Sequence, residues 1–465
     1  MDVHYTSLET DDETNFLVYE MVDLTKEKGR PGGLRFLGCV VSIAAGVVGG
    51  PLLGLPYCFH LVGVTAATGM LLFAAVLTGY SGQLLSRTFK ELYPTLHASD
   101  EFAASPYLGM ASAAGGRWLA RFAGVVIFVQ SLLFLSFGFI VVGSNLQSLC
   151  PAIPETWWIL IFSTVLVIPL MVRPNPRDWW WTQLVALGTS TLSCIAIVAL
   201  SIGSMHDPNV GYSSDANRSA TGFTYQHFSE AVGAILLAFS GHYVFPTLQI
   251  DMKEPDRLPS AIKVSYGIIL FLFLFVGIFG QLGYEASVQH YFRGTASVNF
   301  TGTPPNLLPK LGGNVLLSLP NGIFRDVAIV FMTAHILFVM VQFSSPVSIF
   351  LDHAFAHVRC CWWIGIRNIE DTREHRLCDQ RKFVMRVLQV GVVVIVAILA
   401  REHLFCFGSL IGASTASFTA FIFPAMFAFQ LLTRATTAER MLWIFVGVVG
   451  LVAGVAATVA AVAAC

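Results

Sequence analysis

Two long apolar segments of the chain are interrupted in their middles by residues that break helices. The first reads GVVGGPLLGLP over residues 46–56, where glycines and prolines interrupt a stretch otherwise long enough to cross a bilayer. The second reads FSGHYVFP over residues 239–246. Because unpaired backbone groups in hydrocarbon are costly, such breaks indicate helices that line a cavity. Freed N–H groups there can hold a carboxylate and freed C=O groups an amine or a cation, as in secondary transporters.

Composition places the chain among membrane proteins. It is 55% hydrophobic and 12% charged with a mean hydropathy of +0.69, whereas soluble domains carry ~25% charged residues. The formal net charge of -1, without a basic patch among aromatic residues, predicts no nucleic-acid partner. The nine cysteines are scattered without a CxxC pair, so neither a disulfide framework nor a zinc finger is indicated.

Eleven stretches supply the ~20 mostly apolar residues that a spanning helix needs. They cover residues 36–58, 62–86, 117–145, 157–172, 182–204, 229–250, 262–285, 321–350, 383–401, 407–431 and 441–463. The chain is therefore predicted to be an all-α polytopic membrane protein with one transmembrane domain, residues 36–463. Residues 1–35 are polar and acidic and predict a disordered cytoplasmic tail.

Two signals predict the same orientation. With the N-terminus in the cytoplasm, most of the 27 Lys and Arg residues fall in cytoplasmic segments. The glycosylation sequons at Asn217 and Asn299 then fall in outer loops. The C-terminus is predicted to be lumenal or extracellular. Tyrosine-based sorting patterns at Tyr5 and Tyr19 point to endosomal membranes, although a plain solvated tail explains them at least as well. A vesicular, vacuolar or lysosomal membrane or the plasma membrane is the expected location.

Several motifs occur in an order that resembles a known family. They are the first break with Leu55-Pro56-Tyr57, Phe239-Ser240-Gly241-His242 with Phe245-Pro246, Met252-Lys253-Glu254-Pro255, and Gly283-Tyr284. Together they resemble the amino acid/auxin permease family, nearest its vesicular inhibitory amino acid transporter and vacuolar neutral amino acid transporter branches. The resemblance implies a leucine-transporter-like fold of five plus five inverted spans with an eleventh appended. It also implies amino acid transport coupled to protons or, in some branches, to sodium. Some branches bridge their outer loops with a disulfide, but segments 205–228 and 287–320 contain no cysteine.

The two breaks supply the predicted substrate-binding residues. Gly46, Gly49 and Gly50 are expected to offer backbone groups to the α-carboxylate and α-amine of the substrate, because glycine lets a ligand approach the backbone. Close helix packing is the alternative for Gly46 and Gly50. In the sixth span the candidates are Ser240, Gly241, His242 and Tyr243. For the intramembrane histidine, a core residue bonded to a carbonyl is an almost equal alternative.

The eighth span supplies the predicted ion-coupling residues Thr333, His335 and Ser344. By the resemblance, a hydroxyl on this span completes a cation site, a part that Thr333 or Ser344 can play. The histidine offers a protonatable group with an ordinary pKa of ~6.5. Proton coupling is favoured, with His335 ahead of His242, and sodium coupling stays open. No cofactor other than H⁺ or Na⁺ is expected.

The function predicted from these observations is secondary active transport of small neutral amino acids. Spans three, six, eight and ten offer no charged partner for an acidic or basic substrate side chain. An ion channel is the alternative from another class, but no selectivity filter or charged ring is evident. An enzyme is not expected, since its one candidate cluster is His353 and His357, followed by Cys360 and Cys361. That cluster is interpreted as part of an interfacial anchor rather than a zinc site.

Glu230 and Glu285 lie at the outer ends of spans and are interpreted as solvated carboxylates at the rim. The expected partners are the amino acid substrate and membrane lipid. The oligomeric state is left open.

Overall fold

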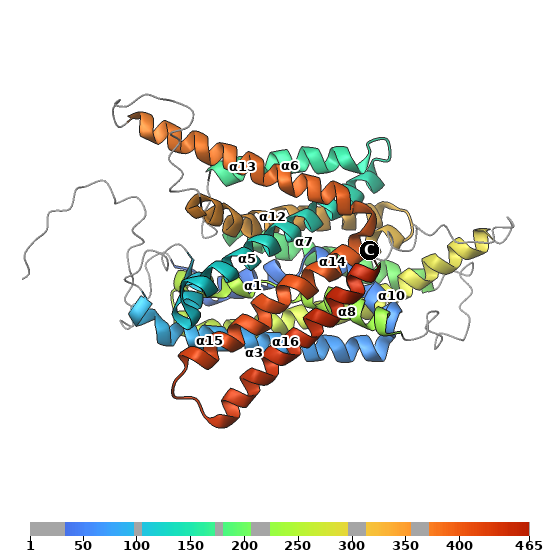
Figure 1. The fold of residues 1–465 in the computed structure, drawn as a ribbon. Helices are drawn as coiled ribbons and strands as arrows, with labels where there is room; N and C mark the ends of the chain where they lie inside the picture. Colours follow the sequence, from blue (N-terminus) through green and yellow to red (C-terminus); the bar gives the residue numbers. More distant parts are fainter. Residues whose placement is uncertain are drawn as a thin grey trace, which may run out of the picture.

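The computed structural model describes residues 33–96, 105–172, 180–205, 224–295, 313–354 and 372–464. Within these ranges every regular element is a helix, and the long helices lie side by side as one bundle (Figure 1). The other long helices are α3 (Val64–Leu96), α5 (Pro106–Leu149), α6 (Glu155–Val172), α7 (Trp180–Met205), α10 (Leu258–Thr295), α12 (Ile323–Ala354), α13 (Thr372–Ala400) and α16 (Thr437–Ala464). Of these, α5 is kinked at Gly115 and Gly116, where the backbone is not helical.

Each of the eleven predicted spans contains a helix. By length and hydropathy alone, eight helices of the described ranges can cross a membrane, or nine with one bent pair. Large apolar side chains point outward from the bundle, among them Val76 on α3, Ile395 on α13 and Val452 on α16. This surface suits contact with lipid chains, as expected of an integral membrane protein.

The first predicted break is present. Helix α1 (Phe36–Val47) ends before Gly49, a 3₁₀ turn (η1, Gly50–Gly54) follows, and α2 (Leu55–Val62) continues at a bend of 48°. Pro51 and Pro56 each lie in the first turn of a new helical segment, where a missing N–H leaves no hydrogen bond unmade. The glycines and prolines thus end one helix and start the next.

The second predicted break is also present. Helix α8 (Tyr225–Ala238) and helix α9 (Phe245–Asp251) are separated by residues 239–241 and a 3₁₀ turn (η3, His242–Val244). Gly241 has φ +120°, a conformation that a residue with a side chain rarely adopts. Pro246 lies in the first turn of α9.

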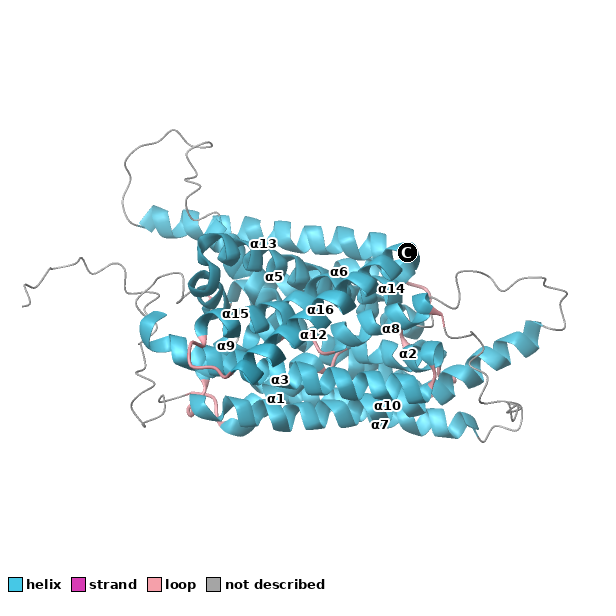
Figure 2. Ribbon diagram, turned by 60° about the horizontal axis from the view of Figure 1, so that its bottom comes forward, coloured by secondary structure: helices cyan, strands magenta, loops and turns pink. Residues whose placement is uncertain are grey.

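The two broken helices run antiparallel through the bundle. In Figure 2, α9 lies at one end, while α2 and α8 lie at the other. At the α9 end, Leu34 forms an isolated bridge with Met252, in which Leu34 N–H donates to Asp251 O at 2.7 Å and Lys253 N–H donates to Leu34 O at 2.9 Å. By the predicted orientation this end is cytoplasmic, and the α2 and α8 end is the outer one.

The tenth span contains an interruption that the sequence did not predict. Helix α14 (Leu404–Ile411) passes through two π turns, Gly412–Ala416 and Phe418–Ile422, before α15 (Phe423–Leu431). At the first π turn, a Cβ on Gly412 would overlap the backbone of Gly233 in α8. The tenth span and α8 therefore pack backbone to backbone, and π turns of this kind often mark functional regions.

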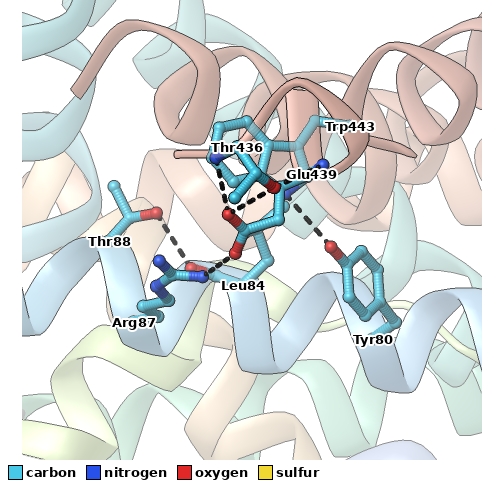
Figure 3. A network of polar contacts seen from close by, with 7 residues as sticks. All are labelled: Tyr80, Leu84, Arg87, Thr88, Thr436, Glu439 and Trp443. Atoms are coloured by element: carbon cyan, nitrogen blue, oxygen red, sulfur yellow. Dashed lines mark hydrogen bonds and ion pairs between the residues drawn. The ribbon is translucent and has the colours of Figure 1, made fainter. Parts of the chain in front are cut away.

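The last helix is fixed to α3 by polar contacts at the predicted cytoplasmic end (Figure 3). Arg87 Nη1 lies 2.7 Å from Glu439 Oε1, and Glu439 Oε2 accepts from Thr436 N–H at 2.9 Å. Glu439 N–H in turn donates to Thr436 Oγ1 at 3.2 Å, which completes a capping box at the start of α16. One turn further on, Trp443 Nε1–H donates to Tyr80 Oη at 3.1 Å.

Candidate functional site

A small cavity of about 20 Å³ lies where the two breaks meet. Three predicted residues line it: Gly46 from the first break, and Ser240 and Gly241 from the second. Helix α12 contributes Gln342. The other lining residues are Ser42, Ile43, Val47, Val244, Phe245, Leu248 and Phe343. The lining residues therefore include two serines and one glutamine among apolar residues, and none of them is charged.

Gln342 is the polar side chain nearest to Gly46. A Cβ built on Gly46 would lie 3.7 Å from Gln342 Oε1 and 3.9 Å from Nε2. The side chain is 9% exposed, and Oε1 has no hydrogen-bond partner among the described residues. A buried amide oxygen without a donor is unfavourable by about 1–3 kcal/mol, so this atom is suited to accept from a bound ligand. The sequence prediction missed this residue.

His335 connects α7 to the first break. Its Nδ1 lies 2.8 Å from the Ala186 carbonyl, and its Nε2 lies where a Cβ on Gly49 would come within 3.4 Å. The ring is fully buried. Nε2 has no hydrogen bond of good geometry among the described residues, although the Val48 carbonyl is close enough to interact with it. A protonatable nitrogen therefore faces the unwound backbone of the first break.

Gly50 faces a different neighbour from the other two glycines. A Cβ on Gly50 would lie 3.0 Å from Phe137 Cε1 on α5. The same ring lies against Gly408 of α14 and lines a second, apolar cavity with Pro51 and Gly54. Phe137 thus fills the space between the first break and the tenth span, on the α2 side of the central cavity.

His242 and Tyr243 are not among the residues that line the central cavity. His242 Nε2 lies 2.9 Å from the Thr78 carbonyl of α3 and 3.4 Å from Tyr266 Oη. Tyr243 Oη accepts from Ser131 Oγ at 3.2 Å. These contacts are those of the core-histidine alternative, and a role of either residue in substrate binding stays a prediction.

Thr333 and Ser344 are not brought together. Asn145 Nδ2 donates to Thr333 Oγ1 at 3.1 Å, and Asn314 Nδ2 donates to Asn145 Oδ1 at 2.7 Å. Ser344 Oγ donates to the Val341 carbonyl of its own helix at 2.7 Å. The two hydroxyls are eleven residues apart on α12, or about 16 Å along its axis, so they cannot hold the same ion.

Glu230 corrects an expectation. Its side chain is 8% exposed, so it is buried between helices rather than solvated at a rim. The side chain of Glu285 lies outside the described residues, as do the sequons at Asn217 and Asn299 and the histidine and cysteine cluster after residue 352. Among the described residues, no three His, Cys, Asp or Glu side chains are grouped to hold a metal ion.

The chain matches known proteins in sequence and in fold. Residues 34–300 and 309–464 match the family described as transmembrane amino acid transporter protein. Amino acid transporter AVT1D of Arabidopsis thaliana is 25% identical over 238 residues, which are 48% of this chain. The match spans only 39% of the length of that relative.

Two solved structures share the fold. MhsT in complex with L-phenylalanine aligns over 91% of this chain and 98% of its own, with 15% identity and a TM-score of 0.55. The Eremococcus coleocola manganese transporter aligns over 92% of this chain and 87% of its own, with 12% identity and a TM-score of 0.54. These likenesses confirm the predicted all-α, leucine-transporter-like architecture. The matches are to transporters, as expected for a protein that is not an enzyme.

Proposed function

Because the chain belongs to the transmembrane amino acid transporter family, we propose that it is a proton-coupled secondary active transporter of small neutral amino acids. Membership confirms the family resemblance, while the branch within the family stays a prediction. The transporter alternates access around the two helix breaks, as leucine-transporter-like proteins do.

The observation that carries this proposal is the cavity between the breaks. Gly46 lines it from the first break, Ser240 and Gly241 line it from the second, and the Gln342 amide lies beside Gly46. An amino acid needs donors for its carboxylate and acceptors for its ammonium, and unwound helices supply both. The uncharged lining supports a neutral side chain on the substrate, and the L-phenylalanine bound by MhsT supports an amino acid as the ligand.

Proton coupling is supported by the placement of His335. Its Nε2 faces Gly49 at the first break, whereas the Ser344 hydroxyl is bonded within its own helix. A histidine that gains and loses a proton beside the break can bias which side of the transporter is open. Sodium bound through Thr333 is the alternative, although that hydroxyl already accepts from Asn145.

The proposal includes a cytoplasmic N-terminus, outer loops glycosylated at Asn217 and Asn299, and a vesicular, vacuolar, lysosomal or plasma membrane location. Lipid is the surrounding partner.

Uptake by the full-length protein in liposomes tests this function. We expect saturable uptake of at least one small neutral amino acid from a radiolabelled panel, driven by a pH gradient and unchanged when choline replaces sodium. Counterflow, in which unlabelled substrate inside the liposomes drives entry of label, separates a transporter from a channel. Conduction without counterflow would contradict transport.

A further inference from the structure

A second ionisable site lies at the outer end of the bundle, away from the breaks. Glu230 belongs to α8 and is buried where that helix packs against α2 and α14. Within the described part of the chain, its carboxylate accepts one hydrogen bond, from Gln226 Nε2 to Oε1 at 3.0 Å. No Lys or Arg of the described residues forms an ion pair with it. An ionised carboxylate in such surroundings is much less stable than in water.

The other groups that face Glu230 can be named helix by helix. On α8 itself His227 lies one turn earlier, and on α2 Tyr57 and Cys58 are close enough to sense its charge. His60 on α2 stacks on Tyr57 with ring centroids 6.1 Å apart.

The remaining helices around α8 bring no charge to this end of the bundle. Helix α14 contributes Ser409 and has no charged residue, and η1 and the first π turn contain no titratable residue. The charged residues of α3 and α16 lie at the ends of those helices that are far from Glu230. They are Arg87, Lys90, Glu91, Glu439 and Arg440. Among the groups named here, His227 beside Glu230 and His60 beyond Tyr57 are therefore those that can carry a positive charge.

We propose that Glu230 is a proton-binding site, which is loaded from the lumenal or extracellular side and couples protons to transport together with His335. This inference rests on the proposed transport function. The neutral carboxyl is compatible with the closed packing of α8 seen here, and the ionised carboxylate favours a state in which water reaches it.

The packing around Glu230 explains how its charge reaches the substrate site. Ser409 Oγ donates to the Glu230 backbone carbonyl at 2.8 Å, and a Cβ on Gly233 would overlap Ser409. Helix α8 therefore packs so closely on α14 that neither a water molecule nor a displacement of α8 can be accommodated without separating the two helices. Because α8 ends at the second break, movement at Glu230 is passed along the helix to Ser240 and Gly241.

The test uses full-length protein in liposomes with radiolabelled L-alanine as the probe and a trapped pH dye. The variant is Glu230→Gln, and the matched control is Glu91→Gln, an exposed carboxylate on α3. Counterflow at equal pH on both sides measures carriage of L-alanine alone, and accumulation under a pH gradient measures coupling. Failure of counterflow in the wild type would count against the proposed function, separately from this site.

We expect Glu230→Gln to keep counterflow but to lose roughly tenfold of gradient-driven accumulation and most of the proton flux, because glutamine cannot carry the proton. The control should match the wild type. Proton-driven accumulation with an unchanged pH profile in Glu230→Gln would overturn the proposal. If the glutamine variant does not reach the membrane, Glu230→Asp decides: it should transport with a displaced pH optimum, and a wild-type pH profile would overturn the proposal equally.

Discussion

His335 and Gly49 face each other across the first helix break: a Cβ built on the glycine would lie 3.4 Å from the imidazole Nε2. The other ring nitrogen is occupied by the Ala186 carbonyl. The hydrogen bond to α7 thus orients the imidazole, and Nε2 is the ring nitrogen that faces the break. Proton uptake at this ring would place a positive charge beside unwound backbone carbonyls rather than beside a regular helix.

We predict that His335→Gln retains counterflow of substrate but loses most of the pH dependence of uptake, because glutamine can donate a hydrogen bond to Ala186 yet cannot gain a proton. Uptake should be measured between pH 5 and 8, where an ordinary histidine titrates, with sodium replaced by choline. Thr333→Val is the comparison, and it should keep the wild-type pH profile. If uptake depended on sodium and His335→Gln left its pH profile unchanged, the coupling site would instead be the hydroxyls of Thr333 or Ser344.

Gly50→Leu should abolish transport without preventing membrane insertion. A Cβ at this position would already lie 3.0 Å from Phe137, so the larger side chain must displace that ring or the break itself. Insertion depends on hydrophobicity, which the substitution increases. The matched control is Gly69→Leu on α3, where nothing lies within 4 Å of the added Cβ. Uptake and surface abundance should be measured on the same cells. Normal uptake by a correctly localised Gly50→Leu protein would show that Gly50 has no part in the mechanism.

Gln342→Leu should raise the KM for substrate by roughly ten- to a hundredfold, with a smaller change in maximal rate, because one hydrogen bond to a charged ammonium is worth about 1.5–3 kcal/mol. Leucine preserves the approximate volume. Gln83→Leu is the control, since that amide bonds to the Gly79 carbonyl within its own helix. Initial-rate kinetics check the prediction, and an unaltered KM would show that the amide does not contact the substrate.

Treatment with an endoglycosidase should increase the electrophoretic mobility of the protein expressed in a glycosylating cell. Asn217→Gln and Asn299→Gln should each remove one increment of that shift, and the double variant should remove it entirely. Glycosylation of a sequon engineered into segment 351–382, which is predicted to be cytoplasmic, would reverse the orientation.

The sequence revealed the breaks because glycine and proline interrupt helices whatever their neighbours are. It did not reveal Gln342, since an amide in an apolar span usually bonds to a neighbouring helix, and only packing shows that Oε1 has no such donor. The sequence does place Gln342 on the same face of α12 as His335, because the two residues are seven positions, or two helical turns, apart.

Two other features depend on tertiary packing and could not be anticipated. Position near a helix end indicated a solvated Glu230, but α2 and α14 cover it. The π turns between residues 412 and 422 occur in a sequence that is compatible with a continuous helix, and contact with the α8 backbone accompanies them.

The bridge between Leu34 and Met252 joins the ends of α1 and α9 that are predicted to face the cytoplasm, so that they move together. Two backbone hydrogen bonds join them, each worth about 0.5–1.5 kcal/mol net. Neither half-helix can swing aside alone without breaking these bonds, so a path to the cytoplasm opens most easily if both move as a pair. Because the bridge is made by backbone atoms, side-chain substitution at Leu34 or Met252 leaves it in place, whereas proline at residue 34 removes one of its donors.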